Sequence, residues 1–214
     1  MICTTIINKD LKGVLEALEA CEMAEIRLDS CDLSMKDIDE CFSSDVPLVA
    51  TCRISEVMTR EPSLQDESLS QQSREIKAMQ IAEKRLVRAI EAGARYVDVE
   101  MEAQKQMSKR VRNAAHENGT VFIRSYHDFE TTGSVEELHG IVEKCRYHGA
   151  DVVKLVTTAH SQEDVDRVMS LYDWCRSEAG NGVEALADGG LVAFCMGDAG
   201  KQSRVDCLKK GAPY

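Results

Sequence analysis

The segment Gly149-Ala150-Asp151-Val152-Val153-Lys154-Leu155-Val156-Thr157 decides the fold. Its run of apolar, β-branched residues predicts a strand that is buried on both faces, as in a parallel sheet. One lysine, Lys154, interrupts the run. A charged ammonium is costly to bury, whereas a buried neutral amine is a nucleophile that can form an imine with a ketone. The other interpretation is an edge strand whose lysine points into water.

Short apolar strands alternate with amphipathic helices along the whole chain. The predicted strands cover residues 2–7, 24–28, 47–52, 95–100, 120–125, 149–157 and 191–196. The predicted helices cover 9–21, a segment capped by Ser34, 67–92, 103–117, 134–148, 161–176 and 203–210. Residues 54–66, which contain Pro62, and the Gly-rich residues 178–190 are predicted to be loops.

This alternation predicts one α/β domain over residues 1–214, with a parallel sheet and right-handed crossovers. An open doubly wound sheet and a closed (β/α)₈ TIM-type barrel both fit the pattern. The barrel is favoured because the unusual polar residues fall at the C-terminal ends of strands, where barrel active sites lie. The alternation covers seven β/α units, so we expect a barrel that lacks most of the eighth unit in this chain.

The composition is that of an ordinary globular protein, with 43% apolar and 29% charged residues among 214. The net charge of -11 argues against a general nucleic-acid binder but allows an anionic substrate in an arginine-lined cleft. The nine cysteines form no metal-ligand spacing, so we expect reduced, mostly buried thiols and no metal site. With no signal-peptide pattern and no long apolar run, a cytoplasmic, soluble protein without a membrane partner is expected.

Polar residues gather at the strand ends, and residues two apart on a strand share one face. These residues are Thr5, Glu25, Arg27, Asp29, Arg53, Asp98, Glu100, Ser125, Tyr126, His127, Lys154 and Arg204. Any one charged pair among them could be a structural salt bridge, and a lone histidine is more often part of a core. Because all seven strands end in such groups, the sequence predicts a single polar cluster.

Several of these motifs together resemble type I 3-dehydroquinate dehydratase, in that family's order and over nearly the whole chain. They are Glu25-Ile26-Arg27-Leu28-Asp29, Thr51-Cys52-Arg53, Ser125-Tyr126-His127-Asp128-Phe129, Val153-Lys154-Leu155-Val156 and the segment from Met196 to Arg204. The resemblance implies the third step of the shikimate pathway of aromatic amino-acid biosynthesis, in which 3-dehydroquinate loses water. It also implies a lyase that needs no metal or organic cofactor and that forms a homodimer.

The chemistry that the resemblance implies is a Schiff-base mechanism. Lys154 would attack the substrate ketone, and the protonated imine would make the adjacent C–H acidic. His127 would take that proton and later deliver one to the leaving hydroxyl. One imidazole can do both only if both groups leave from the same side, so a syn elimination is expected.

The resemblance also implies which residues bind the substrate. Arg204 and Arg53 would hold its carboxylate, with Arg204 preferred for bidentate pairing. Glu25 and Arg27 would hold the ring hydroxyls, and Thr5 would supply a further hydroxyl contact.

Two features depart from the family pattern. Glu56 lies in a predicted loop without glycines and is one candidate for orienting His127, and Asp98 and Glu100 are other candidate anionic partners. The eighth unit of the family pattern and its substrate-covering loop are missing. We therefore expect weaker substrate binding but retained imine chemistry. Two alternatives stay open: another Schiff-base barrel lyase of the class I aldolase type, and a truncated, non-catalytic barrel that acts as an interaction module.

Overall fold

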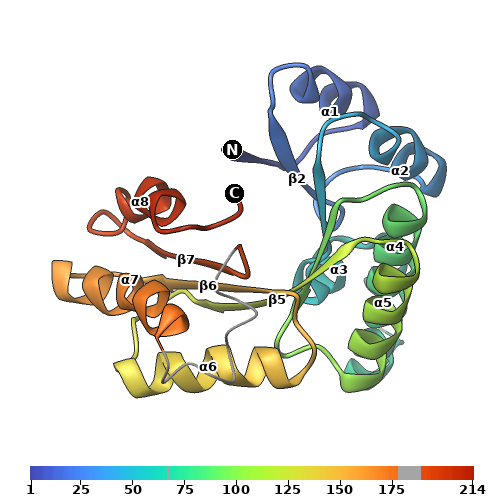
Figure 1. Ribbon diagram of the computed structural model, residues 1–214. Coiled ribbons are helices and arrows are strands. Elements are labelled where there is room, and N and C mark those ends of the chain that lie inside the picture. The colour runs from blue at the N-terminus through green and yellow to red at the C-terminus, as the bar shows by residue number, and fades with distance from the viewer. Residues whose placement is uncertain (67, 178–188) are drawn as a thin grey trace. The chain divides into compact units, whose positions relative to one another are not determined.

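The structure, a computed structural model, describes residues 1–66, 68–177 and 189–214. Contacts between residues divide the chain into two compact units. One contains residues 2–122, and the other contains residues 123–214 together with Met1. Strands and helices alternate along both units (Figure 1). The expectation of one domain over residues 1–214 stays a prediction.

The unit of residues 2–122 is built on four parallel strands. They are β1 (Cys3–Ile6), β2 (Met23–Arg27), β3 (Leu48–Thr51) and β4 (Tyr96–Glu100), which pair in that order. The register aligns Arg27 with Thr51, and Thr51 with Asp98. Aligned residues of parallel strands project from the same face of a sheet. One face therefore carries a row of polar side chains at the C-terminal ends of β2, β3 and β4.

Helices connect these strands and cover the sheet. They are α1 (Leu11–Leu18), α2 (Met35–Phe42), α3 (Ile54–Arg60), the short 3₁₀ helix η1 (Pro62–Leu64), α4 (Gln71–Glu91) and α5 (Lys105–Glu117). Figure 1 shows α4 and α5 side by side, and α4 also packs against α2 and α3. The buried residues Ala78, Ala82 and Leu86 recur every four positions along α4, which is the spacing of one helix face.

The prediction of a loop over residues 54–66 was wrong. Residues 54–60 form α3, and Glu56 and Arg60 form an i,i+4 ion pair on its exposed side. Pro62 does not interrupt this helix, because it lies beyond its end and occupies the first turn of η1, where no N–H is needed. Of the Gly-rich loop predicted over 178–190, residues 178–188 lie outside the described part of the chain.

Three parallel strands form the core of the second unit. They are β5 (Val121–Asp128), whose first two residues belong to the other unit, β6 (Val152–Thr158) and β7 (Leu191–Met196). The helices of this unit are α6 (Val135–Tyr147), α7 (Gln162–Arg176) and α8 (Ser203–Lys209). β5 continues three residues beyond its predicted end, so that His127 lies on the strand. Ser134 and Ser161 begin α6 and α7 with capping boxes, in which side chains satisfy the first backbone N–H groups.

β6 is not an edge strand. It pairs with β5 on one side and with β7 on the other, and six of its seven residues are buried. The interpretation in which Lys154 points from an edge into water was therefore wrong. The interpretation of a strand buried on both faces is confirmed.

Seven parallel strands, each followed by a helix, lie in the described residues. This is the β/α-barrel class that the sequence predicts, with seven of the eight units represented. Seven of the nine cysteines are buried, as expected. None of the helices in residues 1–66, 68–177 and 189–214 has the length and apolar character that crossing a membrane requires.

Candidate active site

Lys154 lies in the middle of β6 with only 7% of its surface exposed. Its neighbours Val153 and Leu155 are fully buried, because the strand runs through the interior of the unit. The register aligns Lys154 with Ser125 on β5 and with Val192 on β7. These three residues project from the same face of the sheet.

His127 lies on that same face. It is two residues beyond Ser125 on β5 and aligns with Val156, which is two residues beyond Lys154. Neighbouring strands lie about 4.8 Å apart and two residues span about 6.6 Å, so long side chains at these positions can meet. The half-buried imidazole of His127 stacks with the ring of Phe129 at a centroid distance of 5.9 Å. The sheet thus brings an amine and an imidazole together on one face.

Arg204 adds a cation to this face. Its guanidinium carbon lies 5.2 Å from the centre of the Phe194 ring, and Phe194 aligns with Val156 on the neighbouring strand. A guanidinium over an aromatic face is held by the quadrupole of the ring. The hydroxyl of Ser203, the preceding residue, donates to the carbonyl of Gly200 (2.6 Å) and accepts from the N–H of Cys195 (2.8 Å). These two hydrogen bonds hold the turn before Arg204 against β7.

A buried ion pair lies on the sheet of residues 2–122. Two nitrogens of the Arg53 guanidinium donate to the two carboxylate oxygens of Asp98, at 2.9 and 3.0 Å. Asp98 is fully buried, and Glu100 lies 3.9 Å from Arg53 Nε. Burial alone would lower the pKa of Arg53, but the charge and hydrogen bonds of Asp98, together with the charges of Glu100 and Glu25, outweigh burial and raise that pKa. Burial raises the pKa of Glu100, although the charge of Arg53 opposes this.

Glu25 accepts hydrogen bonds from hydroxyl groups on both neighbouring strands. Thr51 Oγ1 donates to one carboxylate oxygen at 2.7 Å, and Thr5 Oγ1 donates to the other at 3.4 Å. Two strands thereby orient one carboxylate at the ends of β1, β2 and β3.

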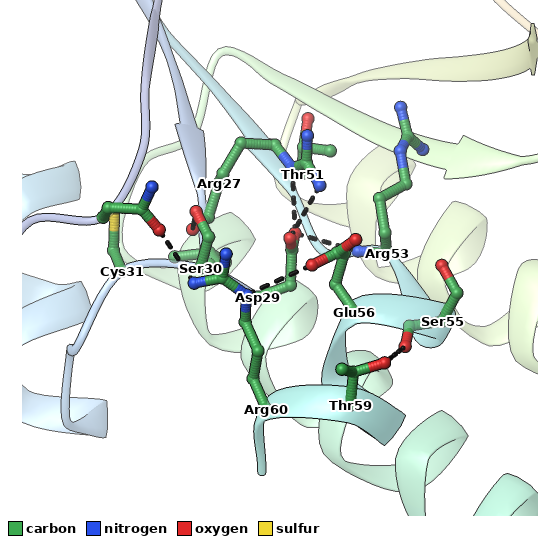
Figure 2. Close-up of polar contacts among 12 residues, drawn as sticks. Arg27, Asp29, Ser30, Cys31, Thr51, Arg53, Ser55, Glu56, Thr59 and Arg60 are labelled. Carbon is green, nitrogen blue, oxygen red and sulfur yellow. Dashed lines mark hydrogen bonds and ion pairs between the residues drawn. The ribbon is translucent and has the colours of Figure 1, made fainter. Parts of the chain in front are cut away.

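Arg27, the next residue on that face of β2, is held by Asp29. Its Nε and one terminal nitrogen donate to the two Asp29 oxygens at 3.1 and 2.7 Å (Figure 2). The N–H of Arg53 also donates to Asp29 Oδ1, at 2.9 Å. Asp29 therefore links the end of β2 to the start of α3.

Glu56 lies on α3, where Arg60 Nε donates to its carboxylate at 3.1 Å (Figure 2). Both side chains are nearly half exposed. The predicted role of Glu56 in orienting His127 stays a prediction.

Each unit thus gathers part of the predicted site. The face of the 123–214 unit carries Lys154, His127 and Arg204, and the sheet of the 2–122 unit carries Thr5, Glu25, Arg27, Arg53, Asp98 and Glu100. Sequence reasoning missed the parts played by Asp29, Thr51, Phe194 and Ser203. Glu25, Arg27 and Asp29 are spaced two residues apart, and this spacing could have indicated the role of Asp29. The roles of Thr51, Phe194 and Ser203 depend on contacts between segments that are distant in the sequence.

A cavity of about 350 Å³ adjoins the Asp29 side of the 2–122 unit. Its lining is formed by Asp29, Ser30, Cys31, Asp32, Val57, Arg60, Glu61, Pro62 and Arg85. In the part of the chain that the structure describes, no group of three or more His, Cys, Asp or Glu side chains is arranged to hold a metal ion.

Comparison with known proteins identifies relatives over the whole chain. The family model of type I 3-dehydroquinase matches residues 2–214. A 3-dehydroquinate dehydratase of Desulfotalea psychrophila is 32% identical over 208 residues, which cover 95% of this chain and 81% of that protein.

Solved structures agree on the fold. The type I 3-dehydroquinate dehydratase of Clostridium difficile superimposes with a TM-score of 0.74 at 21% identity, covering 99% of this chain and 80% of that one. The deoxyribose phosphate aldolase of Aeropyrum pernix reaches a TM-score of 0.55 at 15% identity, covering 99% and 81%. At these identities both comparisons speak for a shared barrel fold alone.

Proposed function

Because this chain belongs to the type I 3-dehydroquinase family, we propose that it removes water from 3-dehydroquinate through an imine on Lys154, with His127 moving the protons. The observation that carries the mechanism is the register of β5 and β6. It puts Lys154 and His127 on one face of the sheet, two residues apart along neighbouring strands.

The first step is attack on the substrate ketone. An ammonium has no lone pair, so the neutral amine of Lys154 adds to the carbonyl carbon. The resulting carbinolamine takes up one proton and loses water to form a protonated imine, and this proton is released again when the imine is hydrolysed. The burial of Lys154 supports this step, because a site poor in water disfavours the charged amine and delays hydrolysis of the imine.

The second step is the elimination. The protonated imine withdraws electrons from the neighbouring carbon, and His127 takes a proton from it. The electron pair moves into an enamine, which then expels the hydroxyl of the next carbon as His127 returns the proton. Water finally hydrolyses the imine and releases 3-dehydroshikimate and the free lysine. One imidazole serves both transfers, so the proton and the hydroxyl leave from the same side.

The substrate carboxylate is assigned to Arg204 rather than Arg53. The fork of Arg53 already pairs with both oxygens of Asp98, whereas Arg204 is exposed and lies over Phe194 on the face that carries Lys154. Arg53 is then proposed to contribute its positive charge to substrate binding, without a bidentate pair of its own to the substrate carboxylate. Glu25, Arg27 and Thr5 are proposed to bind the ring hydroxyls.

Turnover of 3-dehydroquinate, followed by the ultraviolet absorbance of the conjugated enone product, tests the activity. Borohydride reduction during turnover should attach the substrate mass to the peptide that contains Lys154. Lys154→Met should abolish both signals, whereas Lys144→Met, a change on α6, should leave both intact. An adduct on another lysine would refute the assignment, and turnover of a sugar phosphate instead would favour an aldolase.

A cytoplasmic location and a homodimeric state complete the proposal. Sedimentation equilibrium of the purified chain measures the second, and a mass of one chain at all concentrations would refute it.

A further inference from the structure

Asp29 is a buried carboxylate that joins two segments of the 2–122 unit, the end of β2 and the residue before α3. Its side chain has no exposed surface, yet it accepts two hydrogen bonds from the Arg27 guanidinium and one from the backbone N–H of Arg53 (Figure 2). A carboxylate can accept about four hydrogen bonds, so three donors nearly satisfy it. These hydrogen bonds connect the end of β2 to Arg53, the residue just before α3.

Arg27 has a second carboxylate within electrostatic reach. Glu25 lies two residues before it on the same face of β2, and its charge acts on the guanidinium. Burial alone would lower the pKa of Arg27, but the hydrogen bonds and charge of Asp29 outweigh it and raise that pKa. Without Asp29, Glu25 would be the strongest remaining anionic partner on that strand. Arg27 would then pair with Glu25, and neither side chain would be available to bind a substrate.

We propose that Asp29 is a positioning residue for substrate binding, which keeps Arg27 apart from Glu25 and fixes the backbone at Arg53. This inference rests on the proposed function, because it assumes that Arg27 and Glu25 bind the ring hydroxyls. Asp29 touches no reacting atom in this scheme. Its removal therefore weakens substrate binding and leaves the imine chemistry of Lys154 in place.

Asp29→Asn is the first test. The amide keeps one oxygen for the Arg53 N–H but turns an NH₂ group towards the guanidinium of Arg27, so the bidentate pair is lost. We expect KM for 3-dehydroquinate to rise about 10- to 100-fold, the effect of losing hydrogen bonds to a charged group, while kcat changes less than about threefold. Asp39→Asn, which breaks an ion pair with Arg88 elsewhere in the unit, is the matched control and should leave KM unchanged.

A purely structural role predicts a different outcome. It would lower the melting temperature and the active fraction of Asp29→Asn, and so the apparent kcat, without raising KM. That result would overturn the proposal. If the wild-type chain itself does not turn over 3-dehydroquinate, the proposed function fails, and this inference falls with it.

Chemical rescue supplies a test that does not depend on the asparagine geometry. Asp29 borders the cavity of about 350 Å³, which gives a small carboxylate a route to the space that Asp29→Ala would open. Formate should lower the raised KM of Asp29→Ala by at least about fivefold relative to chloride at equal ionic strength, and should not affect Arg27→Met. If both variants respond equally, or neither responds, Asp29 does not act through Arg27.

Discussion

Two arginines on the 2–122 sheet are each held by an aspartate. Arg53 pairs with Asp98, and Arg27 pairs with Asp29. Arg204 differs, because an aromatic ring lies beneath its guanidinium. A guanidinium held by a bidentate carboxylate is fixed in place but has fewer donors left for a ligand. An aromatic ring leaves the donors at the edge of the guanidinium available, and this is the physical reason to assign the substrate carboxylate to Arg204.

Replacing the ring beneath Arg204 should weaken substrate binding. Phe194→Leu keeps an apolar side chain on β7 but removes the cation–π contact. We expect KM to rise about two- to fivefold, with kcat and borohydride trapping at Lys154 unchanged. Phe194→Tyr retains the ring and should behave like the wild type. An unchanged KM in Phe194→Leu would show that Arg204 is held in another way.

Glu100 should make stability depend on pH. Burial raises its pKa in the folded state, so the stability it contributes is present below the ordinary glutamate pKa and is lost as the pH rises through the raised value. Glu100→Gln cannot ionise and should be more stable than the wild type at pH 7, with the difference vanishing near about pH 4. Denaturant titrations at several pH values measure this.

The control for this experiment is Glu102→Gln, which removes the same charge from an exposed position nearby. It should not reproduce the pH-dependent gain. If Glu100→Gln is less stable than the wild type at pH 7, the attraction of Arg53 at 3.9 Å outweighs burial.

At the scale of elements, β7 is the last strand of the sheet order in the described residues, and side chains cover its outer edge. The carbonyls of Gly190 and Met196 accept hydrogen bonds from the neighbouring segment that contains β6. Backbone groups of successive residues point to alternate edges of a strand, so those of Ala193 and Cys195 point to the edge of β7 away from β6. There the hydroxyl of Tyr172 on α7 bonds both the N–H and the carbonyl of Ala193, at 2.7 and 3.1 Å. Ser203 Oγ accepts from the N–H of Cys195. Side chains thus satisfy backbone groups that would otherwise be an unpaired edge.

Removing the Tyr172 hydroxyl should destabilise this edge. Tyr172→Phe leaves two backbone groups of Ala193 without these hydrogen bonds, and we expect the free energy of unfolding to fall by about 1–3 kcal/mol. Tyr147→Phe removes the hydroxyl of a tyrosine that is 86% exposed, and should change the free energy by less than about 0.5 kcal/mol. Equal effects in the two variants would mean that the edge does not depend on Tyr172.

The turn between β7 and α8 leaves no room for a side chain at Gly200. An added Cβ would lie 2.6 Å from the carbonyl carbon of Cys195, and in contact with the Met196 carbonyl oxygen. Because these are backbone atoms, the turn itself must shift. Gly200→Ala is expected to lower the free energy of unfolding by about 1–3 kcal/mol, and to raise KM because Arg204 follows the turn.

Gly140 provides the opposite case for this test. It lies within α6, and an added Cβ would meet nothing within 4 Å. Gly140→Ala should therefore raise the free energy of unfolding by about 0.5–1 kcal/mol, since alanine has less freedom to lose in a helix. Thermal or denaturant unfolding of both variants measures the contrast, and the explanation fails if Gly200→Ala is the more stable one.

At the scale of the whole molecule, the order of strands and helices could be predicted because burial leaves a period of two or 3.6 residues in each segment. The helix α3 was missed because its residues are mostly polar and Pro62 follows closely. The contact of Thr51 with Glu25 and that of the Arg53 N–H with Asp29 could not be predicted, because they join segments that lie far apart in the sequence. Lys154 on β6 indicated the site because a lysine is not expected in a strand that is otherwise mostly apolar and buried.

The cysteines differ in exposure, so their reactivity can test which parts of the described residues are buried. Cys3 and Cys21 are partly exposed, whereas the other seven are buried, and burial raises the pKa of Cys41 and Cys175 to about 11. The thiolate is the reactive form, so buried thiols should react slowly with an aromatic disulfide reagent near neutral pH.

We expect at most two thiols to react rapidly in the native protein and all nine after denaturation. Cys21→Ser should remove one of the fast-reacting groups. Mass spectrometry of the labelled peptides locates the modified positions. Fast labelling of Cys195, a buried residue of β7 in the unit that carries Lys154, would contradict the packing of that unit, because reagent could reach this thiol only if water reached the interior as well. A protected interior is what the imine on Lys154 requires, so this measurement bears on the chemistry as well as on the fold.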